Sequence, residues 1–324
     1  MDQLSLIQKR LEPELKQMNE IIRQSLATTN DLMDRVVQNY LKVKGKQIRP
    51  IMVLLSAAMF GEITLNVLRA GAALEMLHNA SLIHDDVVDE TDLRRGKNTI
   101  NREWGNQIAV LVGDFFVSNA LATGIQTGNL EIVTSLSDLG KELSLGEVDQ
   151  ICNAREHSFE EARYLDMIEK KTASLFINCV KMGAEAVGAT REMYADLMEF
   201  ARLLGLSFQI KDDIFDYTPS PEIGKPTGND LKEGKVTLPL LYALRTALNG
   251  DAEKMKDLLI KGDLSESEIN ALLYFAIENK GIDYAYNVMR DMQQEAEKKL
   301  AGYPDSQWKQ SFLDLFEYII TRKY

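Results

Sequence analysis

Cysteine, histidine and positive charge are all scarce in this sequence, and each shortage excludes a class of function. The 324 residues include two cysteines, Cys152 and Cys179, and three histidines. Because the two cysteines have no metal-like spacing, we expect neither a disulfide framework nor a zinc site. The 37 Lys and Arg residues stand against 49 Asp and Glu, for a net charge of −12. Nucleic-acid binding requires a surplus of Lys and Arg, so no nucleic-acid partner is expected.

Long hydrophobic runs are also missing from the pattern. Residues 1–26 mix acidic and basic side chains throughout and lack the apolar segment of a signal peptide. No apolar segment is expected to be long enough to span a membrane. The sequence therefore predicts a cytoplasmic protein without a transmembrane segment.

Proline is rare, and few segments alternate apolar and polar residues as a half-buried strand does. The pattern predicts an all-α protein. Residues 217–234 hold three prolines and three glycines and are predicted to form a long polar loop. Composition does not shift along the chain, so we expect one domain over residues 1–324. The expected helices cover residues 3–26, 31–41, 50–60, 64–89, 105–127, 130–152, 158–187, 190–217, 236–248, 252–260, 265–278, 281–301 and 305–322.

Two clusters of aspartate are the most informative feature that is present. Each has three aspartates at positions i, i+1 and i+4, of which i and i+4 share a helix face and lie ~6 Å apart along the axis. Apolar neighbours surround both clusters, so the carboxylates would repel one another and lose hydration. One cluster alone would indicate a solvated acidic face, but the repeat favours a shared site for divalent cations. The clusters are Asp85, Asp86 and Asp89, and Asp212, Asp213 and Asp216.

Carboxylates without a Cys or His partner set indicate Mg2+, with Mn2+ also possible. Mg2+ is usually held by one or two carboxylates together with water and substrate phosphate. The two clusters would therefore suit several Mg2+ ions that bridge a diphosphate. Replacing Asp85 or Asp212 by Ala is expected to lower turnover by orders of magnitude and to leave folding intact, because it relieves like-charge repulsion.

Basic residues lie beside the clusters and beside glycine and proline, where a diphosphate would need them. Arg94 and Arg95 follow the first cluster, and Arg is suited to bidentate phosphate contacts. Lys46 and Arg49 precede a predicted helix start at Pro50, where backbone N–H groups also favour anions. The remaining candidates are Lys171 with Thr172, Lys225 and Lys235.

Together these residues resemble the trans-isoprenyl diphosphate synthase family, in its medium- to long-chain type, which includes octaprenyl diphosphate synthases. The resemblance covers roughly residues 40–245. Lys44 stands where many members have the first glycine of a Gly-Gly-Lys sequence, and we expect this to alter the loop and not the chemistry. The motifs are Gly45-Lys46-x-x-Arg49-Pro50, His78, the first cluster with Arg94-Arg95-Gly96, Lys171-Thr172, Gln209 with the second cluster, and Gly224-Lys225 through Asp230 to Gly234-Lys235.

The resemblance implies a single-domain bundle of ten or more helices around a central cavity, and a homodimer. It implies a Mg2+-dependent prenyltransferase that condenses isopentenyl diphosphate head-to-tail with an allylic diphosphate to make an all-trans-polyprenyl diphosphate. The departing diphosphate leaves an allylic carbocation, which the double bond of isopentenyl diphosphate attacks before a proton is lost. Metal ions and basic side chains stabilise the departing charge.

The resemblance also implies a role for each matched residue. Asp85, Asp89 and Asp212 would bind Mg2+, and Asp86, Asp213, Asp216 and Asp230 would support them, partly through water. The allylic diphosphate would be held by Arg94, Lys171, Thr172, Gln209, Lys225 and Lys235. Isopentenyl diphosphate would be held by Lys46, Arg49, His78 and Arg95. The expected catalytic residues are Asp85, Asp89, Asp212, Lys171 and Arg94.

Small residues before the first cluster bear on product length. In this family bulky residues there stop the growing chain, whereas this sequence has Ala80 and Ser81. Small residues also allow close helix packing, so the inference is not unique. With one helical turn per isoprene unit, an open tunnel predicts about six to ten units, and about eight is the single expectation. Phe115, Phe116 and Leu121 are candidates for the tunnel floor. Such products usually become quinone side chains, and their release would involve transient membrane contact.

Other functions stay open on the sequence alone. A shorter-chain geranylgeranyl or farnesyl diphosphate synthase would carry the same motifs. A class I terpene cyclase shares the ionisation chemistry but usually has an Asn/Ser/Glu triad as its second metal motif. Glu75-x-x-His78 matches half of a di-iron site, yet no second Glu-x-x-His is present. A non-catalytic partner subunit would generally lack the aspartate clusters.

Overall fold

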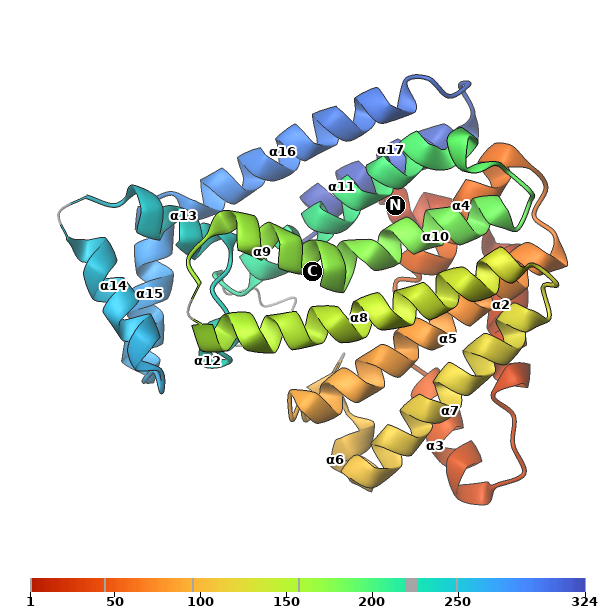
Figure 1. Cartoon of the computed structure of the whole chain (residues 1–324), viewed down its shortest axis with the longest axis horizontal. Helices are drawn as coiled ribbons and strands as arrows, with labels where there is room; N and C mark the ends of the chain where they lie inside the picture. The colour runs from red at the N-terminus through yellow and green to blue at the C-terminus, as the bar shows by residue number, and fades with distance from the viewer. Residues whose placement is uncertain are drawn as a thin grey trace. The chain divides into compact units, whose positions relative to one another are not determined.

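The computed structural model describes residues 2–43, 45–94, 96–156, 158–218, 227–248 and 250–323, without the side chains of 153–156. This part of the chain is helical almost throughout, which confirms the all-α prediction (Figure 1). A two-stranded antiparallel hairpin pairs β1, Leu93–Arg94, with β2, Lys97–Asn98. The helices are α1 Gln3–Arg10, α2 Glu12–Ser25, α3 Asp31–Leu41, α4 Ile48–Phe60, α5 Leu65–Val88, α6 Ile100–Trp104, α7 Asn106–Ile125, α8 Leu130–Glu156, α9 Glu161–Ile168, the π-helical turn η1 Glu169–Ala173, α10 Ser174–Glu185, α11 Arg191–Phe215, α12 Asn229–Lys232, α13 Leu238–Thr246, α14 Asp251–Lys261, α15 Glu266–Glu278, α16 Gly281–Leu300 and α17 Gln307–Thr321.

The chain divides into two compact units. The first unit contains Met1–Lys141, Leu175–Met198 and Pro304–Phe312. The second unit contains Glu142–Ser174, Glu199–Tyr303 and Leu313–Tyr324. Helices α8, α11 and α17 each contribute residues to both units. The expectation of a single domain over residues 1–324 stays a prediction.

In the first unit, α5 packs against α2, α4 and α7, and Figure 1 shows α5 and α7 side by side. Apolar side chains cover α4 on all sides, which is the pattern of a helix buried within a core. The approach of α7 to α5 depends on Gly113, because a Cβ there would lie 2.2 Å from the imidazole Nε2 of His84. His84 immediately precedes the first aspartate cluster, so this packing places the end of α5.

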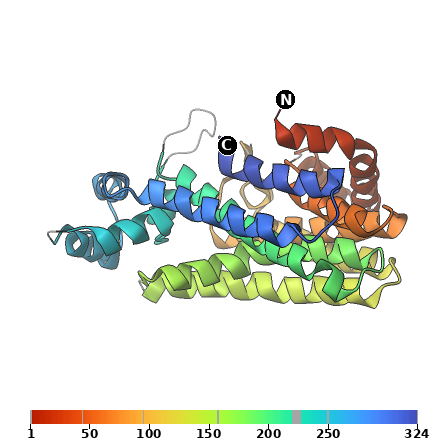
Figure 2. The ribbon, with the colours of Figure 1, turned by 90° about the horizontal axis from the view of Figure 1, so that it is seen from above.

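In the second unit, α13 contacts α14, α15 and α16, and these helices lie against one another in Figures 1 and 2. Their core is closed by Leu240, Leu244 and Leu272, and it includes Tyr217 from the turn after α11. Tyr217 directly follows the last aspartate of the second cluster, so the buried ring anchors the end of that cluster.

The predicted helices were confirmed with small shifts at their ends, and the differences have local causes. Residues 3–26 form two helices because Leu11 ends α1 and Pro13 stands at the start of α2. The helix predicted to begin at Pro50 begins two residues earlier, at Ile48. The predicted helix 158–187 begins later and is interrupted by the π-helical turn η1.

The predicted loop over residues 217–234 contains some regular structure. The stretch 217–234 includes the short helix α12, while residues 219–226 lie outside the described residues. A helix of one turn leaves too weak a periodic pattern to be seen in sequence.

Helix α7 corrects the expectation about membrane-length runs. The helix has 20 residues, and an 18-residue window within it has a mean hydropathy of 1.7, so by length and composition alone it would be long enough to cross a membrane. Core helices of globular proteins meet the same test, and α7 packs along α5. A single such helix is weak evidence for a membrane span.

Candidate active site

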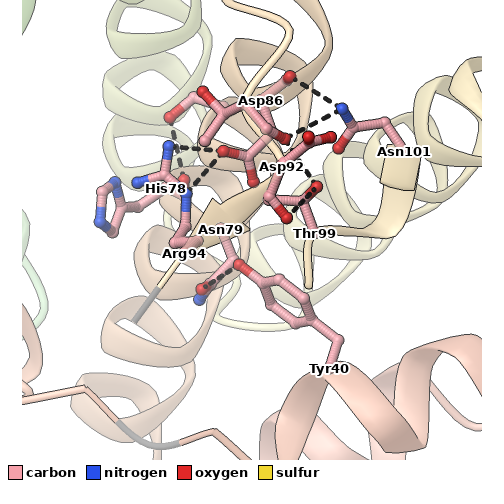
Figure 3. Close-up of polar contacts among 10 residues, drawn as sticks. Tyr40, His78, Asn79, Asp86, Asp92, Arg94, Thr99 and Asn101 are labelled. Atoms are coloured by element: carbon pink, nitrogen blue, oxygen red, sulfur yellow. Dashed lines mark hydrogen bonds and ion pairs between the residues drawn. The ribbon is translucent and has the colours of Figure 1, made fainter. Parts of the chain in front are cut away.

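The first aspartate cluster lies at the carboxyl end of α5 and its members differ in exposure. Asp86 is 4% exposed, whereas Asp85 is half-buried and Asp89 is exposed. Arg94 reaches back from β1 and donates to Asp86 Oδ1 from Nε at 2.8 Å and Nη2 at 2.7 Å (Figure 3). Burial raises the pKa of Asp86, and the hydrogen bond and charge of Arg94 oppose that shift. The Asp86 carboxylate therefore binds the Arg94 guanidinium, while the carboxylates of Asp85 and Asp89 are accessible to solvent.

Backbone groups at the end of α5 hold the hairpin and thereby Arg94. The Asp86 carbonyl accepts from Thr91 N at 2.9 Å and from Asn101 Nδ2 at 3.1 Å. Thr99 Oγ1 donates to the Thr91 carbonyl at 2.7 Å (Figure 3). The two bonds to Asp86 use a carbonyl that the end of α5 would otherwise leave without a partner. Arg94 is thus placed by the way α5 ends.

The first unit also contains three of the residues expected to hold isopentenyl diphosphate, Lys46, Arg49 and His78. The Arg49 guanidinium carbon lies 5.5 Å from the Phe176 ring centroid. His78 is buried on α5, and the Lys46 carbonyl accepts from Gln8 Nε2 at 2.8 Å in the segment before α4. Arg95 and the departure at Lys44 lie outside the described residues.

The second aspartate cluster lies at the end of α11, and its three carboxylates are used differently. Asp213 is 5% exposed, and both its oxygens accept hydrogen bonds, from Gln209 Nε2 at 2.8 Å and from Tyr164 OH at 2.6 Å. Asp216 accepts from two backbone N–H groups at the start of α12, at 3.0 and 3.1 Å. Asp212 accepts from Arg322 through Oδ1, and no donor among the described residues contacts its Oδ2. Of the three, Asp212 alone has an oxygen to which no described residue donates.

A hydrogen-bonded chain joins the predicted Lys-Thr motif to this cluster. Thr172 Oγ1 donates to Gln209 Oε1 at 2.7 Å, and Gln209 in turn donates to Asp213. Thr172 stands in the π-helical turn η1, and such turns occur often at functional sites. Gln209 is therefore fixed by hydrogen bonds at both its amide oxygen and its amide nitrogen, and it links Thr172 to Asp213.

Lys171, in the same turn, contacts α8. Its Nζ donates to Gln150 Oε1 at 2.7 Å and lies 2.6 Å from Glu147 Oε2. The two segments approach closely at Gly146, where a Cβ would lie 3.1 Å from the Lys171 backbone, a tight contact. Sequence reasoning did not find Glu147, Gln150 or Tyr164, since none of them belongs to a local motif.

One open cavity of the second unit brings six of the predicted residues together. The cavity has a volume of about 1250 Å³, which includes the open space at its mouth. The backbone N–H of Lys235 donates to the Asp230 carbonyl at 2.8 Å, and its ammonium pairs with Glu233. Lys225 lies outside the described residues. The six are Lys171, Thr172, Gln209, Asp213, Asp230 and Lys235.

Negative charge in this cavity is costly without a cation. Burial raises the pKa of Asp213 to about 6, against the hydrogen bonds from Tyr164 and Gln209. Burial, followed by the charges of Asp213 and Asp216, raises the pKa of Asp230 to about 8. The carboxyls therefore hold protons more tightly than solvated carboxyls do, and a bound cation would reverse this preference.

The raised pKa values predict that the ligand-free protein loses stability as pH rises from about 4 to 8. An unfolded Asp has a pKa near 4, so within that range the folded state binds more protons than the unfolded state does. Asp230→Asn removes one of these groups and should raise the free energy of unfolding at pH 8 by at least about 1 kcal/mol. Urea denaturation at pH 5.5 and pH 8 tests this. Asp196→Asn, at an exposed position of α11, is the control, and a wild type that gains stability with pH would contradict the prediction.

The carboxylates of the two clusters can be compared with the ligands that a divalent cation requires. In the part of the chain that the structure describes, no group of three or more His, Cys, Asp or Glu side chains is placed to hold a metal ion by itself. Mg2+ does not need such a group, because it keeps several waters and uses one or two carboxylates with substrate phosphate. The open Oδ2 of Asp212 and the accessible Asp85 and Asp89 fit that requirement. That both clusters serve one diphosphate stays a prediction.

Comparisons with known proteins agree with one another. A family model described as polyprenyl synthetase matches residues 30–276. The octaprenyl diphosphate synthase of Haemophilus influenzae is 35% identical, over 98% of this chain and 97% of its own. A solved geranylgeranyl pyrophosphate synthase from Bacteroides thetaiotaomicron is 38% identical with a TM-score of 0.86, over 99% of this chain and 100% of its own. A Caulobacter crescentus polyprenyl synthase, complexed with calcium and isoprenyl diphosphate, is 29% identical with a TM-score of 0.92, over 99% and 98% of the two chains.

Proposed function

Because the chain belongs to the polyprenyl synthetase family and is a prenyltransferase, we propose that it is a Mg2+-dependent, long-chain all-trans-polyprenyl diphosphate synthase. It would add isopentenyl diphosphate units to an allylic diphosphate. The observation that carries this proposal is the cavity in which Lys171, Thr172 and Lys235 lie with buried carboxylates. Cations and carboxylates in one cavity suit a diphosphate bound together with a metal ion. Because the chain belongs to the polyprenyl synthetase family, we do not propose a di-iron protein or a terpene cyclase.

Each matched residue then has a proposed task. Asp85, Asp89 and Asp212 would hold Mg2+, which supplies charge neutralisation at the departing diphosphate. The Caulobacter relative contains calcium with isoprenyl diphosphate, which supports a divalent cation here. Asp86, Asp213, Asp216 and Asp230 would orient these ligands and their waters, as their hydrogen bonds and burial suggest.

The basic residues divide between the two substrates. Lys171, Thr172, Gln209, Lys225, Lys235 and Arg94 would hold the allylic diphosphate and offset the charge that builds as its carbon–oxygen bond breaks. Isopentenyl diphosphate would be held by Lys46, Arg49, His78 and Arg95. Apolar helix faces would exclude water from the allylic cation. The proton lost after attack would leave with the released diphosphate, so no side-chain base is required.

The decisive test is product chromatography with the purified chain alone. With farnesyl diphosphate, isopentenyl diphosphate and Mg2+, we expect a long polyprenyl diphosphate, and chelation of the metal should abolish its formation. Cyclised hydrocarbon from farnesyl diphosphate alone would contradict the proposal. Absence of turnover by the single chain, regained on adding a second protein, would show a heteromeric enzyme instead.

Product length is proposed from the residues before the first cluster. The relatives include both octaprenyl and geranylgeranyl synthases, so family membership leaves the length open. Ala80 is fully buried, and Ser81 is partly buried with its hydroxyl donating to the His78 carbonyl at 2.9 Å. With no bulky side chain at either position, we propose a product of about eight units, as one unit takes up roughly one helical turn. Such a product would serve as a quinone side chain.

Ser81→Phe is expected to shorten the product to about four units or fewer, because the ring would block growth roughly one turn below the aspartates. Ser81 is the better site than Ala80, since a large residue at a fully buried position costs about 1–3 kcal/mol in strain. Chain lengths are compared by chromatography. Ser267→Phe, at an exposed position of α15, is the control, and an unchanged long product from Ser81→Phe would refute the tunnel assignment.

The remaining proposals concern assembly and location. Helix α7 is strongly apolar, yet Val110, Leu111 and Ile125 are exposed on it. An exposed apolar surface of this kind marks an interaction site, so we propose a homodimer that covers it. We also propose a cytoplasmic enzyme whose product reaches a membrane by transient contact. Sedimentation analysis of the purified protein tests the oligomeric state.

A further inference from the structure

Arg322, the residue after α17, makes direct contact with the second aspartate cluster. Its Nη2 donates to Asp212 Oδ1 and, at 3.2 Å, to the carbonyl of Phe208. Phe208 and Asp212 are four residues apart on α11, so the guanidinium spans one turn of that helix. Its carbon lies 4.4 Å from the Phe208 ring centroid and 5.3 Å from that of Phe215. Arg322 belongs to none of the motifs found in the sequence.

The packing of α17 holds the guanidinium in place. The Arg322 side chain is 6% exposed, and its backbone N–H continues the helix by donating to the Tyr318 carbonyl at 2.8 Å. Phe316 packs edge-on against Phe200 of α11, with ring centroids 5.6 Å apart. Ile319 and Ile320 are buried as well. Moving the cation would therefore require moving a packed helix.

Burial also explains why the cation pairs with Asp212. A buried guanidinium is costly unless a carboxylate compensates it. Asp213 and Asp216 are already hydrogen-bonded through both oxygens, and nearby Lys211 donates to Tyr286 OH at 2.7 Å instead. Asp212 therefore pairs with the Arg322 guanidinium, and it accepts the hydrogen bond through Oδ1 only. Its side chain is still 39% exposed.

We infer that Arg322 is a positioning residue that holds Asp212 through Oδ1 and so presents Oδ2 to a divalent cation. This inference rests on the metal site of the proposed function. Carboxylates that bind metal are themselves oriented by hydrogen bonds, and loss of such a partner typically lowers metal affinity about 10–100-fold. Because the rings of Phe208 and Phe215 keep the guanidinium on Oδ1, it does not occupy the coordinating oxygen.

The test is Mn2+ binding by calorimetry in the presence of inorganic pyrophosphate, with the full chain. Arg322→Met keeps much of the apolar packing and removes both hydrogen bonds, and we expect it to weaken Mn2+ binding about 10–100-fold. Arg322→Lys keeps the charge but loses the planar guanidinium that lies against the Phe208 and Phe215 rings, so an intermediate loss is expected. Lys323→Met removes the neighbouring exposed charge and should bind as the wild type does.

The outcomes separate this inference from the proposed function. If the wild type binds Mn2+ and Arg322→Met binds it equally well or more tightly, the positioning role is wrong and the metal site stands. If the wild type binds no Mn2+ with pyrophosphate, the metal site of the proposed function fails and the role of Arg322 fails with it. Thermal melting establishes which variants are folded. If Arg322→Met does not fold, Arg322→Lys takes its place: Mn2+ binding as tight as that of the wild type, or tighter, would then show that the positioning role is wrong.

Discussion

Asp85→Ala is expected to lower kcat/KM for polyprenyl synthesis on the order of 10³-fold while the protein stays folded. Asp85 is a proposed metal ligand on the carboxyl end of α5, and it is half-buried near Asp86 and the exposed Asp89. A ligand that helps to neutralise several kcal/mol of developing charge accounts for an effect of about this size. Removing one of three neighbouring carboxylates relieves repulsion in the metal-free protein, which offsets the lost attraction between Asp85 and the Arg94 guanidinium, so the protein should stay folded.

Steady-state rates with farnesyl and isopentenyl diphosphates, together with a thermal melt, measure both parts of this result. Asp92→Ala is the matched control because Asp92 carries the same charge close by and, among the described residues, its carboxylate pairs with the exposed Arg102, at 3.5 Å. A surface pair of that kind contributes little. A loss of less than about tenfold in Asp85→Ala would remove Asp85 from the metal site.

Asp212→Ala is expected to abolish activity to a similar degree and, unlike Asp85→Ala, to destabilise the protein. Repulsion within the cluster alone predicted unchanged folding, but the structure pairs Asp212 with the buried Arg322. Removing the carboxylate leaves that cation without its counter-charge, which typically costs about 3–5 kcal/mol for a fully buried pair. Since Asp212 is 39% exposed, we expect a smaller loss, about 2–3 kcal/mol.

The double variant Asp212→Ala/Arg322→Met provides the control for this stability effect. With both partners gone no buried charge is stranded, so the double variant should regain most of the free energy of unfolding that Asp212→Ala loses. Urea denaturation measures all four members of the cycle. If Asp212→Ala is as stable as the wild type, the Asp212–Arg322 pair does not matter for folding and the original expectation was right.

Much of the fold and part of the site could be predicted because their signals are local. The helix at 31–41 was predicted with the bounds that the structure has, and α5, α7 and α11 within a few residues. The two aspartate clusters were found by a spacing of four residues, which a helix converts into a shared face. Lys171, Thr172 and Gln209 entered through short motifs, and the structure places all three beside one cavity.

The tertiary structure alone decided which side chains and backbone groups bind each carboxylate of the second cluster. Spacing cannot tell Asp212 from Asp213, because the two are adjacent and chemically identical. Tyr164 and Arg322 make that distinction, and they come from positions distant in the chain. Such contacts carry no periodic signal, since they depend on which helix faces pack together. Local spacing thus determined that carboxylates gather at two helix ends, and long-range packing determined which oxygen at the second of them is left open.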